Sequence, residues 1–169
     1  FLIATPLIDL PPFGRSVVLL LEHDETGSVG LILNKDSGLL VADLLPDVAP
    51  LVTEPAHVFI GGPVSTDTAV ALAHAPERSF LRPSPLASIG LIDPTDPPDG
   101  VRALRIFAGY AGWDPGQLEA EIDEQAWWTT RPNVAAIFTD TRDLWRDTLK
   151  RAPGRAPLFL TFPDDPSTN

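Results

Sequence analysis

The sequence has 169 residues, 44% of them hydrophobic, and a formal net charge of -11 at pH 7. This length and apolar fraction suit one folded unit, so we expect a single domain over residues 1–169. A surface this acidic repels phosphate backbones, which makes nucleic acid an unfavoured partner. The chain has no cysteine, and this excludes disulfides, thiolate nucleophiles and zinc–sulfur or iron–sulfur sites.

The apolar runs are too short for a membrane segment. Charged residues, proline or glycine interrupt each run well before the ~18 residues that a span requires. The opening residues Phe1–Ala4 are apolar, but they lack the basic flank and the length of a signal sequence. The sequence does not begin with Met, and this leaves open whether further residues precede Phe1. We therefore expect no membrane association and a cytoplasmic protein.

Short apolar and β-branched runs between turn residues predict the sheet. Val17–Glu22 and Val29–Leu33 flank a polar turn and predict a β-hairpin. The other predicted strands are Leu2–Ala4, Val58–Ile60, Ala69–Ala73, Ala87–Ile92, Ala103–Ala108 and Leu158–Phe162. Because short turns join neighbouring strands and few helices intervene, the pattern predicts an α+β fold with a mixed, largely antiparallel sheet.

A few helices are predicted outside this sheet. The first begins near Asp114, which can cap it, and Gln117 can reach back to that cap. Its apolar stripe consists of Leu118, Ile122 and Ala126. A second helix is predicted over Thr141–Arg151, where apolar residues recur at helical spacing. Segments 41–45 and 134–138 fit either a short helix or a strand.

Motifs of the common enzyme classes do not occur in the sequence. It contains no glycine-rich phosphate loop, no dinucleotide fingerprint and no G-x-S-x-G turn. Ser16, Ser28 and Ser65 are candidate nucleophiles only because serine is common. The three histidines are far apart and lack the spacing of a helical metal site, so we predict no metal and no cofactor.

His23 is the titratable residue most compatible with catalysis. It ends an apolar strand beside Asp24 and Glu25, so a nearby carboxylate could orient it as a general base. In that interpretation the protein is a small enzyme, such as a hydrolase. In the alternative interpretation, His23 only hydrogen-bonds the backbone of its hairpin turn.

A basic stripe lies in the second predicted helix and beyond it. Its members are Arg142, Arg146, Lys150, Arg151 and Arg155. Such a stripe could bind nucleic acid or an acidic partner. However, Asp143 and Asp147 dilute its charge, and cations near a helix C-terminus stabilise the helix itself. A solvated helix face is the simpler interpretation.

Two glycine-rich segments give the hypothesis for a binding site. Gly61-Gly62-Pro63 and Gly109-Tyr110-Ala111-Gly112-Trp113 each follow a predicted strand. Such glycines indicate positive φ or a close approach of another group, and Tyr and Trp are typical of pockets and interfaces. We expect both segments to converge on one concave surface; the alternative is that Tyr110 and Trp113 fill the core. The predicted binding residues are His23, Asn34, Gly61, Gly62, Pro63, Gly109, Tyr110, Gly112 and Trp113, with His23 or Asn34 facing the surface.

Four segments also occur in an order known from one family. They are FLIATP at 1–6, the stretch from FGRSVV to GLILN at 13–34, GGPV at 61–64, and the stretch from GYAGW to GQLEAE at 109–121. Trp127 and Leu144-Trp145 supply two later aromatic positions. Together these features resemble the AlgH/YqgE family of small bacterial proteins, and the resemblance covers nearly the whole chain.

The resemblance implies a bent, bifurcated sheet that curls into a pseudo-barrel with a few helices outside. For function it implies a regulatory role, because the family carries a regulator label that comes from an effect of one member on alginate production. The sequence shows no DNA-reading helix and its net charge is -11, so we expect that role to be indirect. We therefore predict a non-enzymatic binding or regulatory protein that acts through a protein partner or a small molecule. A small enzyme that uses His23 is the alternative, and direct nucleic-acid binding is least favoured.

Overall fold

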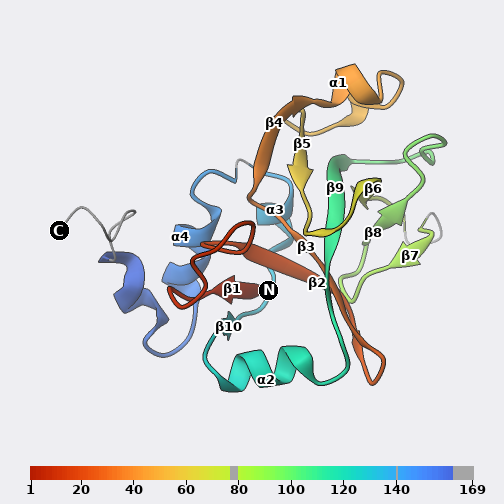
Figure 1. Cartoon of the computed structure of the whole chain (residues 1–169). Coiled ribbons are helices and arrows are strands. Elements are labelled where there is room, and N and C mark those ends of the chain that lie inside the picture. The colour runs from red at the N-terminus through yellow and green to blue at the C-terminus, as the bar shows by residue number, and fades with distance from the viewer. Residues whose placement is uncertain (77–79, 140, 162–169) are drawn as a thin grey trace.

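A computed structural model describes residues 1–76, 80–139 and 141–161 (Figure 1). Within these residues, ten strands form a mostly antiparallel sheet that carries four α-helices. The strands are β1 (Leu2–Ala4), β2 (Val17–Asp24), β3 (Gly27–Ile32), β4 (Asp36–Leu40), β5 (His57–Ile60), β6 (Val64–His74), β7 (Arg82–Pro83), β8 (Ile89–Ile92), β9 (Ala103–Trp113) and β10 (Trp127–Thr129). The helices are α1 (Val41–Leu44), α2 (Gln117–Asp123), α3 (Val134–Ile137) and α4 (Leu144–Arg151), with 3-10 turns η1 (Ala49–Leu51) and η3 (Ala156–Thr161). The predicted α+β class is confirmed.

The sheet forks along β9. The last residues of β9 pair antiparallel with β3, in the register Gly30 to Ala111. Its middle residues pair in parallel with β5, in the register Ile60 to Ala108, while β6 pairs along the other edge. This fork confirms the bifurcated sheet that the resemblance implies. In the described chain the strand order runs from β10 to β7 without joining them, so the sheet is not closed.

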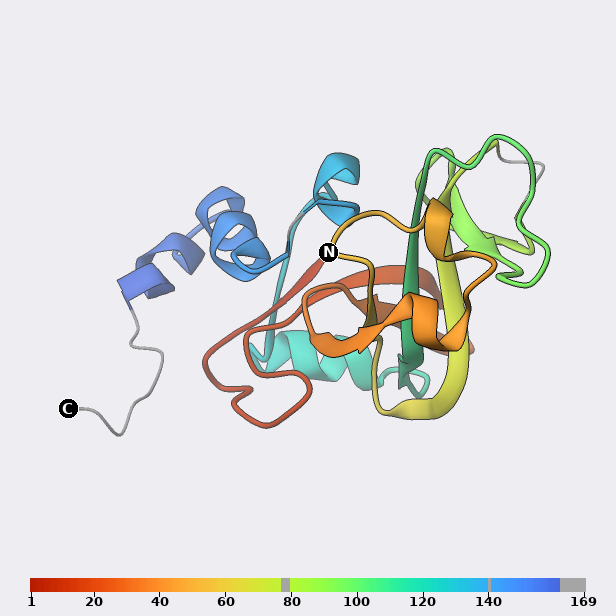
Figure 2. The same cartoon turned by 90° about the horizontal axis from the view of Figure 1, so that it is seen from above.

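The two longer helices, α2 and α4, each bury apolar side chains, and Figure 2 shows where they lie around the sheet. Leu144, Trp145 and Leu149 of α4 belong to the same buried cluster as Ile3 of β1, Leu19 of β2 and Leu31 of β3. Leu118 of α2 packs in another cluster with Trp113 and Trp127. Burial of these faces is the main stabilisation available to such short helices.

The start of α2 differs from the prediction. Gly116 is the N-cap residue, with φ of 77°, and no side chain caps the helix there. Asp114 therefore does not cap α2, because the left-handed turn after it is made by a glycine. The other half of the prediction is confirmed: Gln117 reaches back, and its Oε1 accepts a hydrogen bond of 3.0 Å from the Asp114 amide. Ala126 lies beyond the helix end but still packs against the cluster that contains Leu118.

Other predicted elements were wrong or shifted. Instead of the predicted strand Leu158–Phe162, the structure has η3, and Phe162 lies outside the described residues. A short apolar run has no periodicity that separates strand from helix, and this one follows Pro157. Both ambiguous segments, 41–45 and 134–138, contain short helices.

No helix in the described part of the chain has the length and apolar character to cross a membrane.

Candidate functional site

The two glycine segments meet at the fork of the sheet. A Cβ atom added to Gly61 would lie 2.2 Å from the carbonyl oxygen of Gly109, and one added to Gly62 would lie 2.2 Å from the carbonyl carbon of Tyr110. Gly109 does not follow a strand, as the sequence suggested, but lies inside β9 with φ of 66°. The close approach that the glycines permit is therefore backbone against backbone.

The remaining predicted residues are spread over the sheet. Trp113 is only 7% exposed and packs in the core, and Tyr110 is partly buried against another cluster. Pro63 and Gly112 are exposed. His23 lies near the turn of the β2–β3 hairpin, where its register partner is Ser28, whereas Asn34 follows the open end of β3. The structure thus joins the glycine segments but separates His23 from Asn34.

His23 lies between a hydroxyl and a carboxylate. Its Nδ1 is 2.8 Å from Ser28 Oγ, and its Nε2 is 3.7 Å from Glu119 Oε1 on α2. The carboxylate that the sequence placed in the adjoining turn comes instead from a helix far along the chain. About half of the His23 side chain is exposed, while Ser28 is 4% exposed.

Asn34 belongs to a pocket that the sequence did not outline. This pocket has a volume of about 350 Å³. It is lined by Arg15, Asn34, Lys35, Arg142, Asp143, Trp145 and Arg146. Four lining residues are cationic and one is anionic, on a chain whose net charge is -11. We call this site the basic pocket.

The hairpin ends form one wall of the basic pocket. Because β2 and β3 are antiparallel, the residues before β2 and after β3 are neighbours. The Asn34 side chain joins them through two hydrogen bonds of 2.9 Å. Its Oδ1 accepts one from the Val17 amide, and its Nδ2 donates the other to the Arg15 carbonyl. Both ends of the amide group are thereby occupied, so Asn34 positions the wall.

Lys35 and Arg15 bring two positive charges together on this wall. Burial lowers the pKa of Lys35 from its ordinary value, and the charge of Arg15 lowers it further. The Lys35 ammonium donates a hydrogen bond of 2.6 Å to the carbonyl of Gly14. Arg15 has φ of 53°, and its guanidinium lies 5.4 Å from the ring centre of Trp145. A bound anion would relieve the unfavourable proximity of these cations.

The other wall is the start of α4 and the turn before it. Trp145 is buried, and its indole nitrogen donates a hydrogen bond of 2.9 Å to the Ala4 carbonyl. This bond fixes α4 against β1. Arg146 donates a hydrogen bond of 3.2 Å to the Leu160 carbonyl. The predicted basic stripe therefore divides: Arg142 and Arg146 face the pocket, whereas Lys150 pairs with Asp147 at 2.8 Å.

Sequence reasoning did not predict Arg15 and Lys35 as site residues. A signal for them was present, because Arg15 precedes the first strand of the predicted hairpin and Lys35 follows the second. The open ends of a hairpin must be adjacent, so these two cations had to be close. The proximity of α4 was not readable from the sequence, because it depends on tertiary packing.

Comparison with known proteins decides the family. A family model described as AlgH-like matches residues 1–157. The chain belongs to the AlgH-like family. Proteins named UPF0301 from Streptomyces coelicolor and Streptomyces avermitilis are 46% and 43% identical to it, and each alignment covers 99% of this chain and 93% of the relative.

Solved structures of similar proteins agree with this AlgH-like fold. A crystal structure of a protein from Corynebacterium diphtheriae has a TM-score of 0.83 at 30% identity, covering 95% of this chain and 90% of that one. The solution structure of the AlgH protein from Pseudomonas aeruginosa has a TM-score of 0.69 at 28% identity, covering 97% and 93%. The resemblance inferred from the sequence motifs is thus confirmed.

Proposed function

We propose that this AlgH-like chain is a non-enzymatic binding protein of the cytoplasm that holds a small anion in the basic pocket. Its regulatory effect is then indirect, through the bound state of that pocket. The observation that carries the proposal is the charge inversion: Arg15, Lys35, Arg142 and Arg146 surround one cavity on a strongly acidic protein. Four cations against one carboxylate give this cavity a positive potential, and such a potential attracts a small anion.

The chemistry of the lining favours a phosphate or a carboxylate group. Guanidinium groups present planar pairs of donors that match both anions, and lysine adds a point charge. A cavity of about 350 Å³ is at the small end for ligand pockets, which run roughly from 300 to 1,000 Å³. Nucleic acid is disfavoured because the acidic remainder of the surface would repel a long polyanion.

Calorimetric titration with inorganic phosphate and with citrate, at low ionic strength, tests this proposal. We expect saturable binding that Lys35→Gln or Arg146→Gln weakens at least about tenfold, since charge-assisted hydrogen bonds to a bound anion contribute about 1.5–3 kcal/mol. Arg102→Gln, a change of an exposed arginine outside the pocket, is the matched control. Absence of binding, or an equal loss with Arg102→Gln, would contradict the proposal.

The pH dependence of binding follows from Lys35. Its pKa is lowered by burial and by Arg15, so it loses its proton at a lower pH than an ordinary lysine. We therefore expect anion affinity to fall as the pH rises through this lowered pKa. Lys35→Gln should remove that part of the pH dependence.

Hydrolysis is a second candidate function, and the geometry of His23 favours it. Ser28 Oγ lies 2.8 Å from Nδ1 of His23, and Glu119 Oε1 lies 3.7 Å from its Nε2. In a hydrolase of this type His23 would take the proton of Ser28 through Nδ1, and Glu119 would orient the other ring nitrogen. The small exposure of Ser28 argues instead that the serine and histidine form a cross-strand hydrogen bond.

A fluorophosphonate probe, which labels activated serines covalently, separates the two functions. The binding proposal predicts that Ser28 is not labelled under conditions that label a control serine hydrolase completely. Hydrolysis of a p-nitrophenyl ester should likewise not exceed the rate of the Ser28→Ala variant. Labelling of wild type that Ser28→Ala and His23→Ala both abolish would establish the hydrolase instead.

A further inference from the structure

An exposed apolar surface lies on the arm of the fold, which we define as residues 36–56 (β4, α1, η1 and the loop to β5). In Figure 1 the arm extends at the top, away from α2 and α4. Its inward side chains Val41, Val48 and Val52 are buried in one core cluster. Four leucines of the arm, Leu39, Leu40, Leu44 and Leu51, are 57%, 48%, 58% and 42% exposed. These are four of the eight large apolar side chains that are exposed in the described chain.

The arm is also strongly acidic. Asp36, Asp43, Asp47 and Glu54 are all exposed, and residues 36–56 contain no lysine or arginine. Burying the leucines against another acidic surface would therefore place like charges together. A surface of leucines among carboxylates is complementary to a partner that carries apolar and basic residues side by side.

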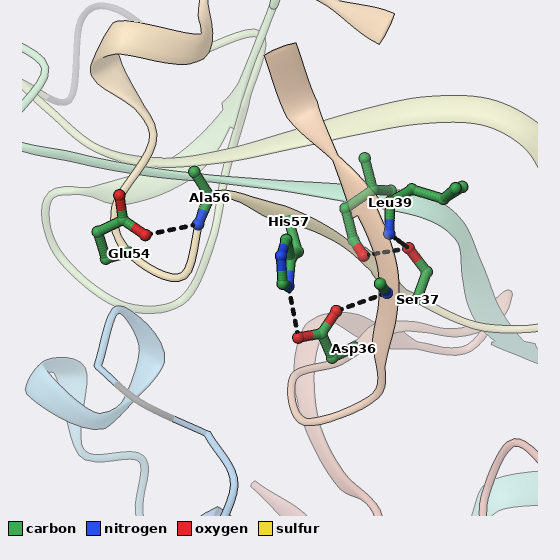
Figure 3. Close-up of polar contacts among 8 residues, drawn as sticks. Asp36, Ser37, Leu39, Glu54, Ala56 and His57 are labelled. Carbon is green, nitrogen blue, oxygen red and sulfur yellow. Dashed lines mark hydrogen bonds and ion pairs between the residues drawn. The ribbon is translucent and has the colours of Figure 1, made fainter. Parts of the chain in front are cut away.

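The arm is held in place before any partner arrives. Asp36 Oδ2 lies 2.8 Å from Nδ1 of His57, and Ser37 Oγ donates a hydrogen bond of 2.6 Å to the carbonyl of Val58 (Figure 3). Burial raises the pKa of Asp36, but the hydrogen bonds from His57 and from the Gly38 amide outweigh this and hold the pKa below its ordinary value. Both contacts join β4 to β5, so a partner meets a pre-organised surface.

The edge of β4 disfavours the addition of a strand. Its backbone amides at Gly38 and Leu39 already donate to the side chains of Asp36 and Ser37, at 2.7 Å and 3.2 Å. Local side-chain bonds of this kind compete with pairing to a new strand. An amphipathic helix forms its own backbone hydrogen bonds and presents side chains alone, so it fits this surface better.

We propose that the arm docks a basic amphipathic helix of a partner protein. The apolar face of that helix packs on Leu40, Leu44 and Leu51, and its lysines or arginines lie opposite Asp43 and Asp47. A second copy of this chain is a poorer partner for the arm, because it would bring the same carboxylates to the contact. This inference is independent of the basic pocket, which lies beside α4.

A fluorescein-labelled 14-residue helical peptide of leucine and lysine, with the leucines on one face, is the probe. Anisotropy titration of the full chain should show saturable binding that weakens with added salt. The double variant Leu44→Gln with Leu51→Gln should weaken binding at least about tenfold, because it removes central apolar contacts. Leu10→Gln with Leu81→Gln removes two leucines that are exposed elsewhere and should leave the affinity within about twofold.

Charge is tested on the same titration. Asp43→Asn with Asp47→Asn should lower the affinity and flatten its dependence on salt. Thermal melts of all variants should match wild type, because every substituted side chain is exposed. The proposal fails if the peptide does not bind, if a peptide with dispersed leucines binds equally, or if the control pair lowers affinity as much. Sedimentation that shows a dimer dissociated by Leu44→Gln with Leu51→Gln would identify a second copy as the occupant instead.

Discussion

Replacing Glu121 by leucine should lower the free energy of unfolding by about 2–4 kcal/mol. Glu121 Oε2 accepts hydrogen bonds from the indole nitrogens of Trp113 and Trp127, at 2.9 Å and 2.7 Å. Both tryptophans are more than nine-tenths buried, so the variant leaves two buried donors without an acceptor. Each such donor costs about 1–3 kcal/mol, less where water can reach it. Gln117 also donates a hydrogen bond of 2.8 Å to Oε1 of Glu121, and the Glu121→Leu variant loses this bond too.

Urea unfolding followed by tryptophan fluorescence measures this effect. Glu121→Gln keeps an acceptor oxygen and should cost less than Glu121→Leu. Glu124→Leu changes a neighbouring exposed glutamate and should stay within about 0.5 kcal/mol of wild type. Equal stability of Glu121→Leu and Glu124→Leu would show that the two indoles do not depend on Glu121.

Gly62→Ala should destabilise the chain by about 3 kcal/mol or more, or prevent folding. The added Cβ would lie 2.2 Å from the carbonyl carbon and oxygen of Tyr110 and 2.3 Å from the amide nitrogen of Ala111. These are backbone atoms of β9, so no side-chain rotation can relieve the overlap. Overpacking usually costs about 1–3 kcal/mol, and the cost is larger where backbone must move.

Gly112→Ala is the control for this substitution. Gly112 lies in the same predicted segment as Gly109, but its added Cβ would meet only side-chain atoms at 3.7 Å and beyond. We expect its free energy of unfolding to stay within about 0.5 kcal/mol of wild type. If Gly62→Ala unfolds at the same urea concentration as Gly112→Ala, the close approach at the fork is not as the structure shows.

The sequence predicted the fold where local patterns determine it. The β2–β3 hairpin follows from two apolar runs around a polar turn, and α4 follows from the helical spacing of Leu144, Trp145 and Leu149. It did not predict β4 or β10, because each pairs with a strand distant in the chain and has little apolar alternation of its own. Such pairings depend on tertiary contacts rather than on local propensity.

The candidate site was predicted only in part. Asn34 was singled out, but the residues around it come from three segments that only the folded chain brings together. The glycine segments were expected to converge on one concave surface; they meet at the fork, where their small size serves backbone packing. A sequence pattern shows that a glycine is required, and not whether backbone or ligand occupies the space beside it.

A titration of the ¹⁵N-labelled chain with inorganic phosphate tests the proposed anion pocket most directly. At neutral pH and low ionic strength, we expect saturable amide shifts concentrated at residues 14–16, 34–35 and 142–146, which surround the basic pocket. The same titration of Arg146→Gln should require a higher phosphate concentration for equal shifts. Shifts that grow linearly without saturation, or that concentrate on another face of the sheet, would contradict the account.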